Sequence, residues 1–171
     1  FVGDGYGKSW VHRYDADRGS LGSFGGHGEE PGKMRTPHGL LIDERGDEPT
    51  LIVADRENNR LQVFDLDGQL LLVVSGMLRR PCQLARHGDD LAVADLAGRV
   101  TILGRDFRMI AQLGENPDQS AWANNGYPKG KWRDGEFVAP HSCAFDPNGN
   151  LYVMDWLRLG RVSKLRRLGD R

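Results

Sequence analysis

Short apolar segments, separated by turns rich in glycine and aspartate, recur along the whole chain. In residues 60–63 the apolar Leu61 and Val63 alternate with the polar Arg60 and Gln62, which is the two-residue period of a strand with one buried face. Asp67 and Gly68 follow this segment as a typical hairpin turn. No apolar run approaches the ~18 residues that span a membrane. The pattern predicts an all-β protein made of short strands joined by tight turns.

One order of strands repeats with a period of about 40 residues, the size of a four-stranded propeller blade. Each unit opens at a proline, and its second strand ends at an aspartate. These two residues lie 18, 14 and 15 positions apart (Pro37 to Asp55, Pro81 to Asp95, Pro140 to Asp155). We predict four-stranded blades over 35–76, 79–114 and 138–169, the latter half of a blade over 1–25, and a long loop over 115–137.

The predicted blades are too few for a closed ring. A propeller needs at least about four blades to close around its axis, and open sheet edges are prone to pairing with other chains. We therefore interpret residues 1–171 as a single partial domain, the C-terminal part of a larger propeller that is truncated at its N-terminus. The alternative is a half-propeller that closes by self-association through its open edges.

Charge and cysteine content narrow the possible partners. The chain has 23 Lys and Arg against 24 Asp and Glu, a net charge of −1, which gives no bulk attraction toward nucleic acid. Its 23 glycines fit an all-β protein with many turns. The two cysteines, Cys82 and Cys143, are too few for a disulfide scaffold. They could form one bridge, but we interpret them as small buried thiols.

The best-defined repeat carries a family signature. Residues 53–64 read Val-Ala-Asp-Arg-Glu-Asn-Asn-Arg-Leu-Gln-Val-Phe, after a Pro-His-Gly opening at 37–39. This pattern resembles the NHL repeat, which usually builds six-bladed propellers. The resemblance implies that the chain is the C-terminal part, about three and a half blades, of a six-bladed NHL β-propeller.

A narrower resemblance concerns the loops between strands. Asp4-Gly5-Tyr6, then Thr36-Pro37-His38, then residues 54–60 resemble peptidyl-α-hydroxyglycine α-amidating lyase (peptidylamidoglycolate lyase). That family cleaves a carbinolamide C–N bond to an amide plus glyoxylate. The resemblance implies a peptide or small carbinolamide substrate. It also implies a secreted or periplasmic location.

The lyase resemblance assigns roles to four residues. Its zinc is held by three histidines, of which His38 and His141 match two, and the third is expected upstream of this chain. Tyr6 matches the catalytic tyrosine, and Arg56 matches an active-site arginine. The family's calcium ligand, an aspartate, is replaced here by Ser142, so calcium binding is in doubt.

The implied chemistry is reasonable for these residue types. The first strands of propeller blades line the channel, so His38, Cys82 and His141 hold equivalent positions around one axis. Zinc can polarise the substrate hydroxyl, a tyrosine can take its proton, and an arginine can bind the carboxylate as a fork. Structural roles remain open: a hydrogen-bonding histidine, Tyr6 as a blade cap, Arg56 as a surface charge, and Cys82 as a small buried residue.

Two loops connect the predicted blades. The loop over 115–137 carries Trp122, Tyr127 and Trp132, which suit a lid or a substrate wall. The shorter loop over 26–35 indicates no function.

The alternative to a zinc-dependent lyase is a non-catalytic NHL-repeat propeller that binds a protein or peptide. RNA binding is disfavoured by the charge balance.

Overall fold

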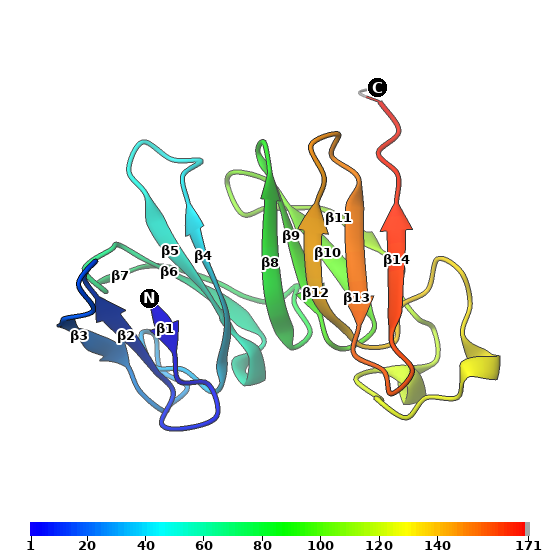
Figure 1. Cartoon of the computed structure of the whole chain (residues 1–171), viewed down its shortest axis with the longest axis horizontal. Helices are drawn as coiled ribbons and strands as arrows, with labels where there is room; N and C mark the ends of the chain where they lie inside the picture. Colours follow the sequence, from blue (N-terminus) through cyan, green and yellow to red (C-terminus); the bar gives the residue numbers. More distant parts are fainter. Residues whose placement is uncertain (170–171) are drawn as a thin grey trace. The chain divides into compact units, whose positions relative to one another are not determined.

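The computed structural model describes residues 1–169. These residues form two compact units, one from Phe1 to Pro81 and one that begins at Cys82. Nearly all regular structure is antiparallel β-sheet, so the all-β prediction is confirmed (Figure 1). Each of the two units has its own pair of sheets.

The first unit contains a three-stranded and a four-stranded sheet, each in sequential order. The smaller sheet consists of β1 (Val2–Gly3), β2 (Trp10–Tyr14) and β3 (Ser20–Gly25). The larger consists of β4 (Pro37–Asp43), β5 (Thr50–Asp55), β6 (Arg60–Phe64) and β7 (Leu70–Val74), with the 3₁₀ turn η1 (Arg56–Asn58) between β5 and β6. Strands therefore form where the alternating pattern predicts them.

The second unit also contains one four-stranded and one three-stranded sheet, but here the four-stranded sheet comes first along the chain. Its four-stranded sheet consists of β8 (Pro81–His87), β9 (Asp90–Asp95), β10 (Arg99–Leu103) and β11 (Met109–Leu113). Its other sheet consists of β12 (Pro140–Phe145), β13 (Leu151–Asp155) and β14 (Arg161–Leu165). The sequence predicts a fourth strand over the last blade. Only Arg166 to Gly169 follow β14 among the described residues, too few for a turn and a strand.

Each unit has an apolar core between its two sheets. In the first unit Val11, Met34, Leu51, Val53 and Phe64 are fully or almost fully buried together. In the second, the small side chains of β9 and β12 allow close sheet packing, because both strands contribute alanine or cysteine (Ala92, Ala94, Cys143). These cores fix the strand ends, from which the loops described below emerge.

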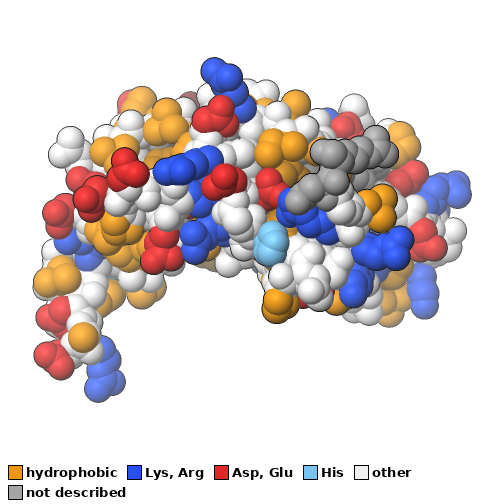
Figure 2. All heavy atoms as spheres, turned by 90° about the horizontal axis from the view of Figure 1, so that it is seen from above, with side chains coloured by type: hydrophobic (Ala, Val, Ile, Leu, Met, Phe, Trp, Pro, Cys, Tyr) orange, Lys and Arg blue, Asp and Glu red, His pale blue; other side chains and the backbone are white. Residues whose placement is uncertain are grey.

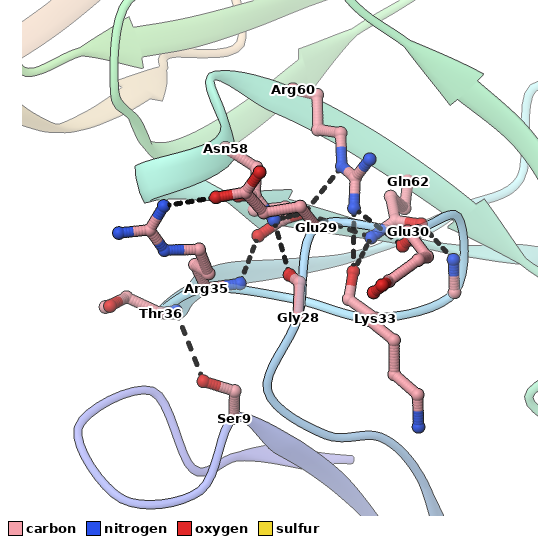
Figure 3. Close-up of polar contacts among 12 residues, drawn as sticks. Ser9, Gly28, Glu29, Glu30, Lys33, Arg35, Thr36, Asn58, Arg60 and Gln62 are labelled. Atoms are coloured by element: carbon pink, nitrogen blue, oxygen red, sulfur yellow. Dashed lines mark hydrogen bonds and ion pairs between the residues drawn. The ribbon is translucent and has the colours of Figure 1, made fainter.

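A buried aspartate ends the second strand in three of the sheets and pairs with an arginine of the next strand. The nitrogen–oxygen distances are 2.7, 3.5 and 2.7 Å (Asp55 with Arg60, Asp95 with Arg99, Asp155 with Arg161). Figure 3 shows the contacts made around the first of these pairs. These Asp and Arg positions therefore brace the ends of these three sheets.

The surface carries both signs of charge. Figure 2 shows Lys and Arg side chains interspersed with Asp and Glu over the visible face, as expected for a net charge of −1. Among residues 1–169, no helix has the length and apolar character needed to cross a membrane.

Candidate functional site

The loop that carries Tyr6 lies between β1 and β2 and is closed by its own backbone. The amide of Ser9 donates to the carbonyl of Asp4 at 3.0 Å, and the Asp4 carboxylate accepts from the amide of Lys8 at 2.9 Å. A Cβ at Gly5 would lie 2.6 Å from the carbonyl oxygen of Pro37. Glycine at this position therefore lets the loop approach the first residue of β4.

This approach brings Tyr6 to two of the other predicted site residues. Nη1 of Arg56 donates to the Tyr6 hydroxyl at 3.0 Å, and the guanidinium carbon lies 5.4 Å from the centre of the Tyr6 ring. The rings of Tyr6 and His38 meet edge to face, with their centroids 6.3 Å apart. The Tyr6 residue remains 81% exposed, so its hydroxyl is accessible from solvent. Three segments of the first unit thus place a phenol, a guanidinium and an imidazole together.

Arg56 is held from its other side by an acidic residue. Its Nε donates to Oε1 of Glu57 at 2.9 Å, and Nη2 of Arg80 donates to the same oxygen at 2.7 Å. Partial burial raises the pKa of Glu57, but the hydrogen bonds and charges of Arg80 and Arg56 outweigh it and lower the pKa below its ordinary 4.5. Glu57 is therefore a carboxylate at neutral pH. Arg56 is 8% exposed, so it is a buried, positioned cation rather than a surface charge.

His38 is the second residue of β4 and lies where the pairing of this strand is irregular. Pro37 pairs with Asp55, but the next pair is Leu40 with Val53, so β4 holds one extra residue at this point. The residue before Pro37 is Thr36, with φ of 58°, an uncommon conformation for a β-branched residue. Such bulges and strained residues cluster at functional sites, where they redirect a side chain.

The second unit repeats this arrangement at His141. Pro140 pairs with Asp155 and Ser142 with Met154, so β12 also gains one residue at the histidine. The indole of Trp156 lies beside the imidazole, with the ring centroids 6.1 Å apart. His141 thus resembles His38 both in its bulged strand and in having an aromatic neighbour.

Cys82 is a further candidate in the second unit. A ring nitrogen of His141 and the Sγ of Cys82 lie within 4.8 Å of each other. Cys82 is fully buried at the start of β8, and neither cysteine forms a disulfide within the described residues. Thiolate and imidazole are the ligands that zinc prefers, so the chemistry of this pair fits a divalent metal ion. The sequence signal was its position, equivalent to the two histidines in the repeat.

The long loop over 115–137 is ordered by its aromatic side chains. The indole nitrogens of Trp122 and Trp132 donate to the carbonyls of Asn116 and Tyr127, at 2.9 and 3.1 Å. Tyr127 is 8% exposed and packs in one apolar cluster with Cys82, Ala121 and Val138, among others. The loop contains the 3₁₀ turns η2 (Gln119–Ala121) and η3 (Lys129–Lys131). These contacts fix the aromatic side chains within the second unit. They do not test a movement of the loop, so its role as a lid stays a prediction.

Comparisons with known proteins find local similarity to NHL-repeat proteins. No protein-family model matches the chain. Protein lin-41 of Caenorhabditis elegans is 43% identical over 56 residues, which is 33% of this chain and 5% of that protein. The E3 ubiquitin-protein ligase TRIM71 of Xenopus tropicalis is 50% identical over 42 residues, 25% of this chain and 5% of that protein. Both are NHL-repeat proteins, and this chain spans about 5% of their length.

Solved structures agree on the fold. Hydrazine synthase of Kuenenia stuttgartiensis matches with a TM-score of 0.60 at 13% identity, over 91% of this chain and 39% of that one. A catalytically inactive virginiamycin B lyase of Staphylococcus aureus matches with a TM-score of 0.58 at 9% identity, over 94% of this chain and 50% of that one. The chain has the fold of a β-propeller, and part of its sequence is similar to NHL-repeat proteins. Because these structural identities are so low, the likeness shows a propeller's fold and not an activity.

Proposed function

We propose that this NHL propeller is a lyase that cleaves a carbinolamide to an amide and glyoxylate. The observation that carries the proposal is the 3.0 Å hydrogen bond between Arg56 and the exposed Tyr6 hydroxyl, beside the ring of His38. A proton-transfer group must be both accessible and fixed in position. Tyr6 is exposed, and Arg56, itself held by Glu57, fixes it.

The reaction needs one proton to leave an oxygen and one to reach a nitrogen. In the proposed reaction, Tyr6 acts as its phenolate, which takes the proton of the carbinol hydroxyl. The carbon–oxygen bond becomes a carbonyl, and the carbon–nitrogen bond breaks with its electron pair on nitrogen. The nitrogen then takes that proton from the Tyr6 hydroxyl, which regenerates the phenolate and leaves an amide and glyoxylate. A carboxylate on the substrate suits the guanidinium of Arg56.

Zinc is the metal that the lyase proposal requires. When bound, it would polarise the substrate hydroxyl and favour loss of its proton. His38 and His141 are its proposed ligands, because each is the second residue of a bulged first strand and each is only half-buried. Tyr6 and Arg56 act separately from this polarisation of the substrate hydroxyl. Tyr6 accepts the proton, and Arg56 positions the phenol.

Glyoxylate release tests the proposal. The chain, supplied with Zn²⁺ and an N-acyl-α-hydroxyglycine, should release glyoxylate faster than buffer with Zn²⁺. Tyr6→Phe should lower kcat by about 10²–10⁴-fold, the usual contribution of a positioned acid–base group. Tyr14→Phe is the matched control, because Tyr14 is an exposed tyrosine of the same unit at the end of β2, and it should leave kcat unchanged. The lyase proposal would be overturned if the chain released no glyoxylate above background, or if both variants changed kcat equally.

Protein binding is the second candidate function, and the sequence relatives favour it. The local matches of 43–50% identity are to lin-41 and an E3 ubiquitin-protein ligase, not to a lyase. Under this alternative, Tyr6 and Arg56 form part of a peptide-binding surface. A chain that binds peptides, releases no glyoxylate and binds no zinc would support it. Glyoxylate release that is lost together with zinc after changing His38 and His141 would instead support the lyase.

A further inference from the structure

We infer that Cys82 and His141 ligate one divalent metal ion through a thiolate and an imidazole nitrogen. The inference rests on the metal of the proposed function, but it needs no lyase reaction. The ligand atoms of the two residues lie within 4.8 Å of each other in the second unit. Two ligands of one tetrahedral zinc, with bonds of about 2.3 Å to sulfur and about 2.0–2.1 Å to nitrogen, fall within that separation.

The two residues hold matching positions in their strands. Cys82 is the second residue of β8, after Pro81, and His141 is the second residue of β12, after Pro140. The repeat therefore gives both side chains the same place at the start of a blade. A sulfur and a nitrogen donor together favour a borderline or soft transition metal, such as zinc, over magnesium or calcium.

The backbone in front of His141 is fixed before any metal binds. The Asp155 carboxylate accepts hydrogen bonds from the amides of Val138 and Ala139, at 2.9 and 2.7 Å. The amide of Trp156 donates to the carbonyl of Ala139 at 2.8 Å, which closes the same segment. The imidazole is thus presented from a rigid strand start, and a preorganised ligand loses less freedom on binding.

The environment of Cys82 differs from that of the other cysteine. Cys143 lies in the core between the sheets, with its Sγ 3.8 and 3.9 Å from the carbonyl oxygens of Ala92 and Gln83. Cys143 is almost fully buried and packs there with Ala92 and Ala94. Cys143 is a packing residue, and it provides a matched control in the same unit.

Cobalt provides a spectroscopic test. The chain is titrated with Co²⁺, because a Co²⁺–thiolate bond gives a near-ultraviolet charge-transfer band that nitrogen and oxygen ligands lack. The wild type and Cys143→Ser should show this band, and Cys82→Ser should lose it. His141→Ala should weaken Co²⁺ binding by more than about 100-fold, the upper end of the loss caused by removing an outer-shell partner.

A second measurement needs no variant. X-ray absorption of the zinc-loaded wild type should show one sulfur scatterer at about 2.3 Å. A zinc-loaded protein without sulfur in its first shell would overturn the inference, as would a charge-transfer band that survives in Cys82→Ser. A chain with the thiolate band but no glyoxylate release would uphold this metal site while rejecting the lyase.

Discussion

Nε of Arg60 lies 2.7 Å from Oδ2 of Asp55, a carboxylate with no exposure to solvent. The same oxygen accepts from the side-chain amide of Asn58 at 2.8 Å, so the charge has more than one donor. Nη2 of Arg60 reaches on to the carbonyls of Glu30 and Lys33, at 3.0 and 2.8 Å (Figure 3). One arginine therefore ties the end of β5 to the loop that precedes the blade.

Removing this arginine should destabilise the protein strongly. We expect Arg60→Met to lower the free energy of unfolding by about 3–5 kcal/mol, because it leaves a buried carboxylate without its cation. Chemical denaturation followed by tryptophan fluorescence would measure the change. Arg108→Met is the control, because Arg108 pairs with Asp106 at an exposed turn, and such pairs contribute about 0–1 kcal/mol. Equal effects of the two variants would show that the buried pair does not brace the blade.

Gly5 should be required for the position of Tyr6. In Gly5→Ala the new methyl group would lie 2.6 Å from the Pro37 carbonyl oxygen, which is backbone and cannot rotate away. We expect the loop to shift and the free energy of unfolding to fall by about 1–3 kcal/mol, as in other overpacked sites. Proton NMR of the Tyr6 and His38 rings would report the shift directly.

The control for this change is another glycine that the structure leaves with space. Gly130 has no atom within 4 Å of an added Cβ, so Gly130→Ala should change stability by less than about 0.5 kcal/mol. If Gly5→Ala keeps wild-type stability and wild-type ring signals, the close approach does not position Tyr6.

The strands were predictable because each leaves a local signal. The alternation around Leu61 and Val63 and the turn at Gly68 depend only on neighbouring residues, and the repeat confirms them three times. The loop over 26–35 was not predictable in this way. It contributes through the backbone carbonyls of Glu30 and Lys33, which every residue type possesses and which carry no mark in the sequence.

The candidate site was predictable only in part. Resemblance to a lyase motif named Tyr6, Arg56 and His38, but it could not show that Arg56 reaches the phenol. Their meeting depends on the close backbone approach at Gly5. Cys82 was interpreted as a small buried residue, because a buried thiol next to apolar neighbours looks the same in sequence whether or not it faces an imidazole. Only its position in the repeat gave a signal.

A hydrogen bond between Tyr127 and Asp118 makes the stability of the loop over 115–137 depend on pH. The Tyr127 hydroxyl donates to Oδ2 of Asp118 at 2.9 Å. Hydrogen bonds from Ser120 and then Tyr127 hold the pKa of Asp118 below its ordinary 3.8, so its contribution to stability is lost as pH falls through that lowered pKa. The same hydrogen bond to Asp118 raises the pKa of Tyr127 above its ordinary 10.0. That contribution is present below pH 10.0 and is lost as pH rises through the raised pKa.

Tyr127→Phe should therefore change the pH dependence of stability at both ends. We expect the alkaline loss due to Tyr127 to disappear and the acid loss to shrink but remain, because Ser120 still donates to Asp118. Thermal unfolding midpoints of the variant and the wild type would be measured from acid to alkaline pH. The difference between the two midpoints at each pH isolates the effect of Tyr127, because the other titrating groups are the same in both proteins. Tyr14→Phe, in the other unit, should follow the wild-type curve. If Tyr127→Phe also follows that curve, the Tyr127–Asp118 hydrogen bond does not hold the loop, and the lid prediction gains ground over a fixed wall.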